Sequence, residues 1–116
     1  MGQGTGPGSG RRRVSRYLIA NIEVKLAEMG RFVETVGIMK AILTAAGWRL
    51  VGGFNLRTGL AGQVTNVWEL ADFDQLDVGF GALAADPRWP QIQAALGVAV
   101  IRETVNFADA VDYPAG

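Results

Sequence analysis

The sequence predicts one α+β domain, built from a four-stranded antiparallel sheet with two helices on one face. In the first half, hydrophobic residues alternate along residues 17–25 and then recur every three or four residues along 29–46. The second half shows the same succession of a strand, a helical stretch and a strand. The resulting order, βαββαβ, is typical of the ferredoxin-like fold. A length of 116 residues suits a single domain of this kind.

The first strand and the first helix are predicted at Tyr17–Lys25 and Met29–Ala46. One face of the strand is apolar and carries Leu18, Ala20, Ile22 and Val24. One stripe of the helix is apolar and carries Met29, Phe32, Val36, Met39, Leu43 and Ala46. Gly47 is expected to end the helix, because a residue without a Cβ adopts a positive φ at little cost.

A β-hairpin is predicted to follow, with strands at Trp48–Leu56 and Gln63–Leu70. Gly52 and Gly53 interrupt the first of these strands, which indicates a β-bulge or a close approach of another part of the chain. The turn-rich residues 57–62 connect the two strands, so we expect them to pair in antiparallel fashion.

The second helical region is predicted in two pieces, at Gln75–Ala85 and Arg88–Leu96. Asp72 or Asp74 is expected to cap the first piece, because a carboxylate oxygen accepts hydrogen bonds from the free amides of the first helical turn. A carboxylate is also favourable at the positive end of the helix dipole.

The end of the domain is predicted from three further signals. Pro90 suits the first turn of the second helical piece, and Gly97 is expected to end that piece. The last strand is then predicted at Val98–Phe107. We therefore expect the folded domain to span residues 15–108, followed by a tail at 109–116.

The charges divide the chain into a basic leader and an acidic body. Residues 1–14 are rich in Gly and Arg and are expected to be disordered, because they offer little apolar surface to bury. Residues 17–116 hold 7 of the 11 basic residues and all 11 acidic ones, which is a net charge of −4. Nucleic-acid binding through the domain is not expected, because phosphate contacts need clustered Lys and Arg. The Arg11–Arg13 run is interpreted as a solvated flank, with a basic arm as the alternative.

The composition excludes several kinds of site. The chain has no Cys and no His, so it has no disulfide, no thiol nucleophile, no serine–histidine pair and no imidazole metal ligand. No metal site and no cofactor are expected. No apolar run approaches the length of a membrane span. A cytoplasmic location is expected, since the lack of Cys fits a reducing compartment.

The sheet face that the helices leave uncovered predicts a homodimer. Tyr17 and Ile19 lie on that face, and Phe54 or Trp68 is expected to join them according to the register. This mixture is too apolar for a face that meets water. A small domain also buries a low fraction of its surface, so burial between two copies would stabilise it.

Four segments of the chain resemble the NIPSNAP family in order and in approximate spacing. They are residues 49–54 (RLVGGF), 62–70 (GQVTNVWEL), 83–89 (LAADPRW) and 102–104 (RET). The resemblance extends over about residues 17–107, and the Val-x-Trp-Glu segment followed by Asp-Pro-x-Trp is its most specific part.

This resemblance implies a dimeric α/β barrel of unassigned activity. Related barrels include cofactor-free oxygenases, decarboxylases and haem-handling proteins, but a shared fold does not define a function. The chain departs from the family at two places. Asn66 stands where family members often have His, and residues 76–80 lack the Arg residues that members carry on the second helix. A His-based or anion-binding site is therefore in doubt here.

Six residues are candidates for a ligand pocket: Tyr17, Asn21, Phe54, Asn66, Trp68 and Arg102. The aromatic members would form a flat apolar wall, and the amides and the guanidinium would orient the ligand. The alternative is that the tryptophans simply pack in the core. Glu23 and Glu69 are either a pair of acid–base groups or partners of Lys25 and Arg49.

Two hypotheses of function follow, and the residues leave open whether the protein is an enzyme. The first is a NIPSNAP-like dimeric module that binds a small apolar ligand or a partner. The second is a cofactor-free oxygenase, isomerase or decarboxylase acting on an aromatic or apolar metabolite. A pocket that holds Asn66 or Arg102 beside a perturbed Glu or Tyr would favour the enzyme, whereas a filled core would exclude it.

Overall fold

The computed structural model describes residues 16–115, so the predicted leader at 1–14 lies outside the described residues. The elements follow one another along the chain as β1 (Arg16–Val24), η1 (Leu26–Glu28), α1 (Met29–Ala45), β2 (Arg49–Asn55), β3 (Gln63–Leu70), α2 (Asp74–Ala85), α3 (Trp89–Ala99) and β4 (Val100–Asp109). Residues 110–115 form no helix or strand.

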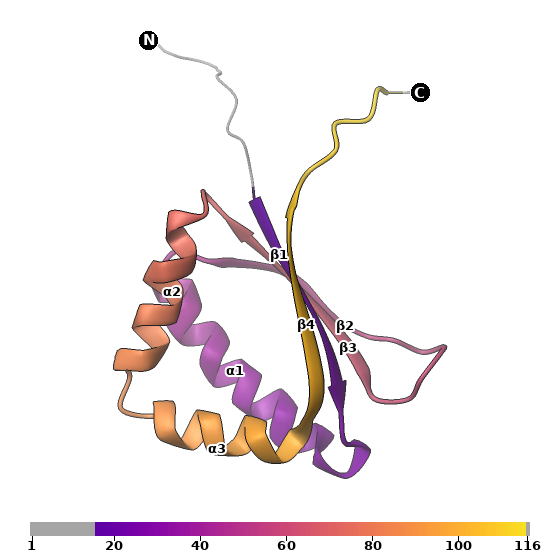
Figure 1. Ribbon diagram of the computed structural model, residues 1–116, viewed down its shortest axis with the longest axis vertical. Helices are drawn as coiled ribbons and strands as arrows, with labels where there is room; N and C mark the ends of the chain where they lie inside the picture. The colour runs from indigo at the N-terminus through magenta and orange to yellow at the C-terminus, as the bar shows by residue number, and fades with distance from the viewer. Residues whose placement is uncertain (1–15, 116) are drawn as a thin grey trace.

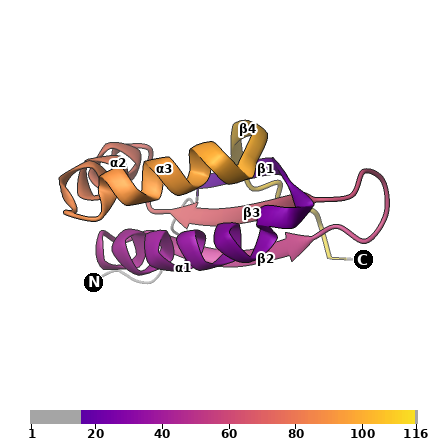
Figure 2. The same ribbon diagram turned by 90° about the horizontal axis from the view of Figure 1, so that it is seen from below.

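The four strands form one antiparallel sheet in the order β2-β3-β1-β4. Figure 1 shows α1, α2 and α3 on the same side of this sheet, and Figure 2 shows α1 next to β2 and β3. The ferredoxin-like fold predicted from the sequence is therefore confirmed. The second helical region forms two separate helices, α2 and α3, as the sequence predicted.

Strand β1 forms the centre of the sheet, because it pairs with β3 on one side and with β4 on the other. Its alternate residues Leu18, Ala20, Ile22 and Val24 are all buried beneath the helices. The intervening residues face the opposite side of the sheet and are half-buried. We call the helix-covered side the inner face and the other side the outer face.

Helix α1 ends where the sequence predicted it would. Gly47 has a φ of +105° and follows the last turn of the helix. The amide of Trp48 then donates a hydrogen bond to the carbonyl of Leu43 over 3.0 Å. The chain thus reverses direction within two residues and enters β2.

Helix α3 continues beyond the residue that was expected to end it. Gly97 does not have a positive φ, and the helix runs on to Ala99, so the prediction of a strand from Val98 was wrong by two residues. A glycine inside a helix costs only about 1 kcal/mol. Burial of Ala99 and a 2.9 Å hydrogen bond from the amide of Lys25 to the carbonyl of Ala99 outweigh this cost.

The predicted interruption of β2 is a β-bulge. The register of β2 against β3 shifts between Leu50 and Gly52. At Gly53, an added Cβ would lie only 2.8 Å from Oδ1 of Asn66. Gly53 therefore also allows the close approach of another part of the chain, here the side chain of Asn66, which was the second interpretation of Gly52 and Gly53.

The turns around α2 and α3 use the predicted residues. Oδ1 of Asp72 accepts a 3.2 Å hydrogen bond from the amide of Gln75, so Asp72, rather than Asp74, supplies the capping oxygen. Pro90 lies in the first turn of α3, where its missing amide hydrogen is not needed.

Helix α2 is held against the start of β2 by Trp48. The indole Nε1 of Trp48 donates a 2.7 Å hydrogen bond to the carbonyl of Gln75. One turn further along, Gly79 lies directly on the indole, and a Cβ at this position would overlap the ring. The absence of a side chain at Gly79 thus determines how closely α2 approaches the sheet.

Two glycines of the same helix should respond in opposite ways to replacement by alanine. Gly79→Ala should destabilise the protein by about 1–3 kcal/mol, because the new methyl group collides with Trp48. Gly81→Ala should stabilise it by about 0.5–1 kcal/mol, because its methyl group would enter open space and alanine favours the helix. Urea unfolding measures both, and equal effects of the two substitutions would contradict this account of the packing.

Candidate functional site

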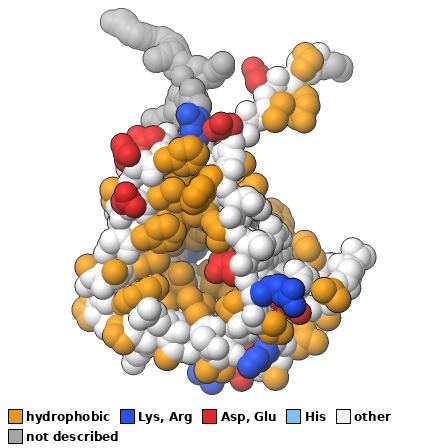
Figure 3. Space-filling model, in the orientation of Figure 1, with side chains coloured by type: hydrophobic (Ala, Val, Ile, Leu, Met, Phe, Trp, Pro, Cys, Tyr) orange, Lys and Arg blue, Asp and Glu red, His pale blue; other side chains and the backbone are white. Residues whose placement is uncertain are grey.

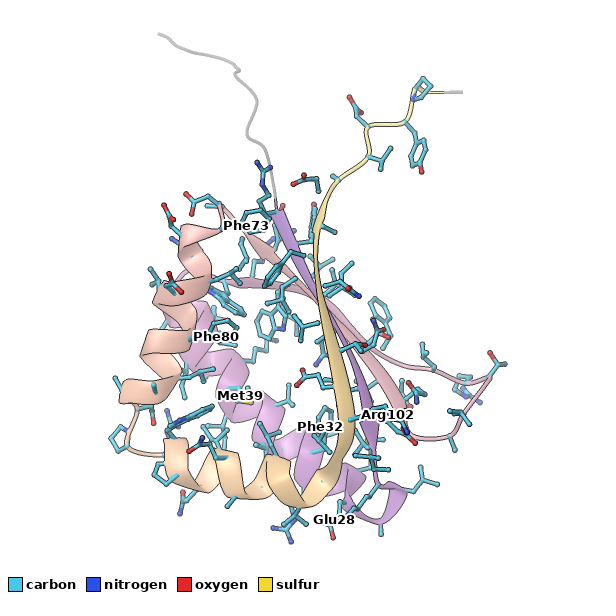
Figure 4. All side chains as sticks on the ribbon, in the orientation of Figure 1. Glu28, Phe32, Met39, Phe73, Phe80 and Arg102 are labelled. Carbon is cyan, nitrogen blue, oxygen red and sulfur yellow. The ribbon has the colours of Figure 1, made fainter. Side chains whose placement is uncertain are left out.

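A cavity of about 560 Å³ lies between the inner face of the sheet and the three helices. Figure 3 shows it as a hollow lined by hydrophobic side chains, with acidic atoms at its edge. In Figure 4, Phe32 and Met39 from α1 and Phe80 from α2 surround this space, and β4 borders it opposite α2. The core is therefore not filled.

The cavity forms because the helices pack on one another more than on β4. Helices α2 and α3 both contact α1, and α1 contacts β2, whereas the inner face of β4 has little cover. Val105 and Phe107 lie on that inner face and remain 45% and 53% exposed. Phe73, just before α2, touches β4 only near its end, with its ring centroid 5.7 Å from that of Phe107.

Aromatic rings form a large part of the wall. Trp48 packs edge to face against Trp68 at 5.6 Å between centroids and against Phe80 at 5.3 Å. Trp89 and Phe32 complete the aromatic lining. Trp48 and Trp68 belong at the same time to the buried core, so both interpretations of the tryptophans apply to them.

Two polar side chains, Asn66 and Glu103, lie among the residues that line the cavity. Asn66 is 7% exposed, on the central part of β3. Both residues lie on the inner face, because Asn66 pairs with Ala20 and Glu103 pairs with Ile22 on β1. From ordinary strand spacings, their Cα atoms are about 12 Å apart, so a small molecule can lie between them.

Partial desolvation of the Glu103 carboxyl in the cavity wall raises its pKa above its ordinary value, although the residue as a whole is exposed. None of the ion pairs found among residues 16–115 involves this carboxylate. Sequence reasoning did not select Glu103, although a signal was present. Glu103 alternates with Val105 and Phe107, so an ionisable residue stands on a face of the strand that is otherwise apolar around it.

The structure separates the six predicted pocket residues into two groups. Asn66 and Trp68 line the cavity, whereas Tyr17, Asn21, Phe54 and Arg102 lie on the outer face. Arg102 and Glu103 illustrate the cause, because neighbours in a strand point to opposite faces. Figure 4 shows Arg102 on the side of β4 away from the cavity. A single pocket made by Tyr17, Phe54 and Trp68 is therefore not formed.

Most polar residues of the outer face already pair with one another. Nε of Arg102 lies 3.0 Å from Oε1 of Glu23, and Nε of Arg49 donates a 2.7 Å hydrogen bond to Oε1 of Glu69. The hydroxyl of Tyr17 donates to Oε2 of Glu69 over 3.4 Å. Glu69 thus pairs with Arg49 as one interpretation expected, while Glu23 pairs with Arg102 instead of Lys25.

Two further features of residues 16–115 concern metal ions and membranes. No group of three or more acidic side chains among them is arranged to hold a metal ion. None of the helices within this range is both long enough and apolar enough to cross a membrane.

The fold and the cavity together define a ferredoxin-like α+β protein with an apolar chamber between sheet and helices. Its fold is similar to that of a NIPSNAP family protein from Agrobacterium tumefaciens, with 21% identity, a TM-score of 0.76, and coverage of 91% of this chain and 94% of the other. An uncharacterized NIPSNAP-like domain protein from Burkholderia xenovorans has 15% identity, a TM-score of 0.72 and coverage of 90% and 92%. The NIPSNAP resemblance expected from the sequence is confirmed at the level of the fold.

A third similar structure has a described activity. SnoaB, a cofactor-independent oxygenase from Streptomyces nogalater, has 15% identity, a TM-score of 0.63 and coverage of 86% of this chain and 96% of its own. A scan against protein-family models found no match, and neither did a search of curated proteins. Similarity at this level of identity establishes the fold alone.

The position of Glu103 predicts a pH-dependent effect of Glu103→Gln on stability. The folded protein keeps the Glu103 proton to a higher pH than the unfolded chain does, so the native protein loses stability as the pH rises through the folded pKa. Glu103→Gln removes this loss. Its stability relative to the native protein should therefore increase from about pH 4 upward and level off above the folded pKa.

Urea unfolding between about pH 4 and pH 8 measures this difference. Glu34→Gln is the matched control, because it removes the same charge at an exposed position of α1. A Glu103→Gln advantage that is constant with pH would show that the carboxyl is not desolvated.

Proposed function

We propose that this protein is a NIPSNAP-like module that binds a small, predominantly apolar ligand in the cavity between sheet and helices. The observation that carries the proposal is the 560 Å³ cavity, which has an aromatic and aliphatic wall and only a few polar groups. Cavities of this size and composition suit drug-sized molecules. The proposal includes a cytoplasmic location, for which the lack of Cys is the support.

The proposal assigns orientation of the ligand to Asn66 and Glu103. An amide in an apolar wall both donates and accepts hydrogen bonds, and its burial makes an unmatched ligand costly. Because Gly53 has no side chain, the amide oxygen of Asn66 can lie close to β2, where a Cβ at position 53 would be only 2.8 Å from it. A ligand in the cavity would meet this amide and the Glu103 carboxyl.

The proposal also includes a homodimer formed through the outer face. Ile19 and Val67 lie side by side near its centre, and Phe54 lies beside them, 52% exposed. Ion pairs border this apolar centre, which resembles the arrangement of a buried interface core inside a polar rim. A second copy would cover the centre without disturbing the cavity on the inner face.

A cofactor-free enzyme remains the second candidate, and one observation favours it. The Glu103 carboxyl has a raised pKa and lies in the same cavity as Asn66, the combination that sequence reasoning named as the sign of an enzyme. A carboxylate of this kind suits proton abstraction next to a carbonyl that the amide polarises. Among the three chemistries considered, the isomerase type therefore agrees best with the residues present.

Filling the cavity should abolish ligand binding. Ala20→Phe places a ring in the cavity from the centre of β1, and the neutral fluorescent probe N-phenyl-1-naphthylamine should then bind at least about tenfold more weakly, or about 1.4 kcal/mol. Ala84→Phe adds the same ring at an exposed position of α2 outside the cavity and serves as the control. Equal probe affinity in both variants would contradict the proposed site.

A charge on the outer face should separate the dimer. Light scattering should give twice the mass of one chain for the native protein and the mass of one chain for Val67→Arg, because a desolvated charge in an interface core is strongly unfavourable. Val33→Arg places the same charge on the exposed side of α1 and should leave the dimer intact. A native protein that is monomeric at micromolar concentration would refute this part of the proposal.

A further inference from the structure

Within residues 16–115, the cavity wall carries a negatively charged side chain but no positively charged one. Among the described residues that line it, Glu103 carries the only charged side chain, and no Lys or Arg is present. The neighbouring Arg102 is directed to the outer face and is already paired with Glu23. A ligand in the cavity therefore meets one carboxylate, aromatic rings and aliphatic groups, without a compensating cation from the protein.

We infer that the ligand is a hydrophobic cation, such as a protonated aromatic or alicyclic amine, whose charge pairs with Glu103. This inference rests on the proposed function of the cavity and names the chemical class of its ligand. The apolar body of such a molecule would lie against Leu83 and the aromatic wall, with the charged nitrogen toward β4.

The carboxylate has a specific need for a cation. No side-chain hydrogen bond or ion pair found within residues 16–115 involves Glu103, so its ionised form is stabilised only by the solvent that reaches it. When an apolar ligand fills the cavity, that solvent is displaced and the carboxylate loses hydration. A cationic group on the ligand replaces the lost hydration, whereas a neutral ligand does not.

The aromatic wall favours the same class of ligand. Trp68, Trp89 and Phe80 line the cavity, and the face of an aromatic ring attracts a cation, with tryptophan as the strongest case. The attraction increases when the cation is removed from water, as it would be in this cavity. The cavity thus offers a cationic ligand both a carboxylate and aromatic rings.

The surroundings of the cavity are also acidic. Asp72, Asp74 and Asp77 lie at the start of α2, and residues 16–115 have eight basic residues against 11 acidic ones. Arg16 lies near Phe73, but it is paired with Asp109 at 3.1 Å. The resulting field would attract a cation toward the cavity and repel a carboxylate or a phosphate.

Three matched compounds test the inference: 2-(1-naphthyl)ethylamine, the corresponding alcohol and 1-naphthylacetate. They share one aromatic body and differ chiefly in charge. Isothermal titration calorimetry at neutral pH should give the tightest binding for the amine and the weakest for the carboxylate, with a difference of at least about tenfold. The native protein, Glu103→Gln and Glu34→Gln are compared, and the last removes the same charge from the surface of α1.

In Glu103→Gln the affinity for the amine should fall by about tenfold while the affinity for the alcohol changes little, and Glu34→Gln should behave as the native protein. Equal affinities for all three compounds, or the tightest binding for the carboxylate, would refute the cationic ligand but leave the proposed cavity intact. If none of the three binds and the neutral probe is insensitive to Ala20→Phe, both the inference and the proposed function are refuted.

Discussion

The contact between Trp48 and α2 determines the geometry on which the rest of the molecule depends. Trp48 follows the cap of α1 at the start of β2, and it is 3% exposed. Its indole donates a hydrogen bond to Gln75, lies against Gly79 and packs edge to face with Trp68 and Phe80. One side chain thereby joins the end of α1, the start of the hairpin and α2.

The packing of the helices on one another explains why the inner face of β4 is bare. Because the helices are gathered on α1, they enclose a space beside β4 instead of filling it. Apolar side chains around this cavity, among them Phe80 and Val105, remain partly exposed to solvent, so they stabilise the fold less than fully buried ones would. A ligand that covers them stabilises the folded state by mass action. The cavity thus lowers the stability of the folded protein, and it is also the basis of the proposed binding.

The sheet separates two surfaces with different chemistry. On the inner face, Glu103 and Asn66 stand among apolar groups, and the carboxylate has no partner found within the described residues. On the outer face, the charged residues pair across strands around Ile19 and Val67. Successive side chains of each strand point to opposite faces of the sheet, and this alternation is sufficient to separate the two surfaces. It places the proposed ligand on one side and the proposed partner on the other, without competition between them.

Much of the fold could be predicted because it depends on local signals. The alternation of β1, the apolar stripe of α1, the positive φ at Gly47 and the bulge at Gly52 were all readable in the sequence. The end of α3 was not, because Gly97 is a local stop signal that the distant contact between Lys25 and Ala99 overrides.

The candidate site depended on information that the sequence holds only in part. Composition alone excluded His and Cys chemistry, and strand alternation was sufficient to place Glu103 with Val105 on the apolar side of the last strand. Only the tertiary structure decided that this side borders a cavity, because that outcome depends on how closely α2 and α3 approach β4. That approach is set by the packing of Trp48 on Gly79, between residues about 30 positions apart in the chain.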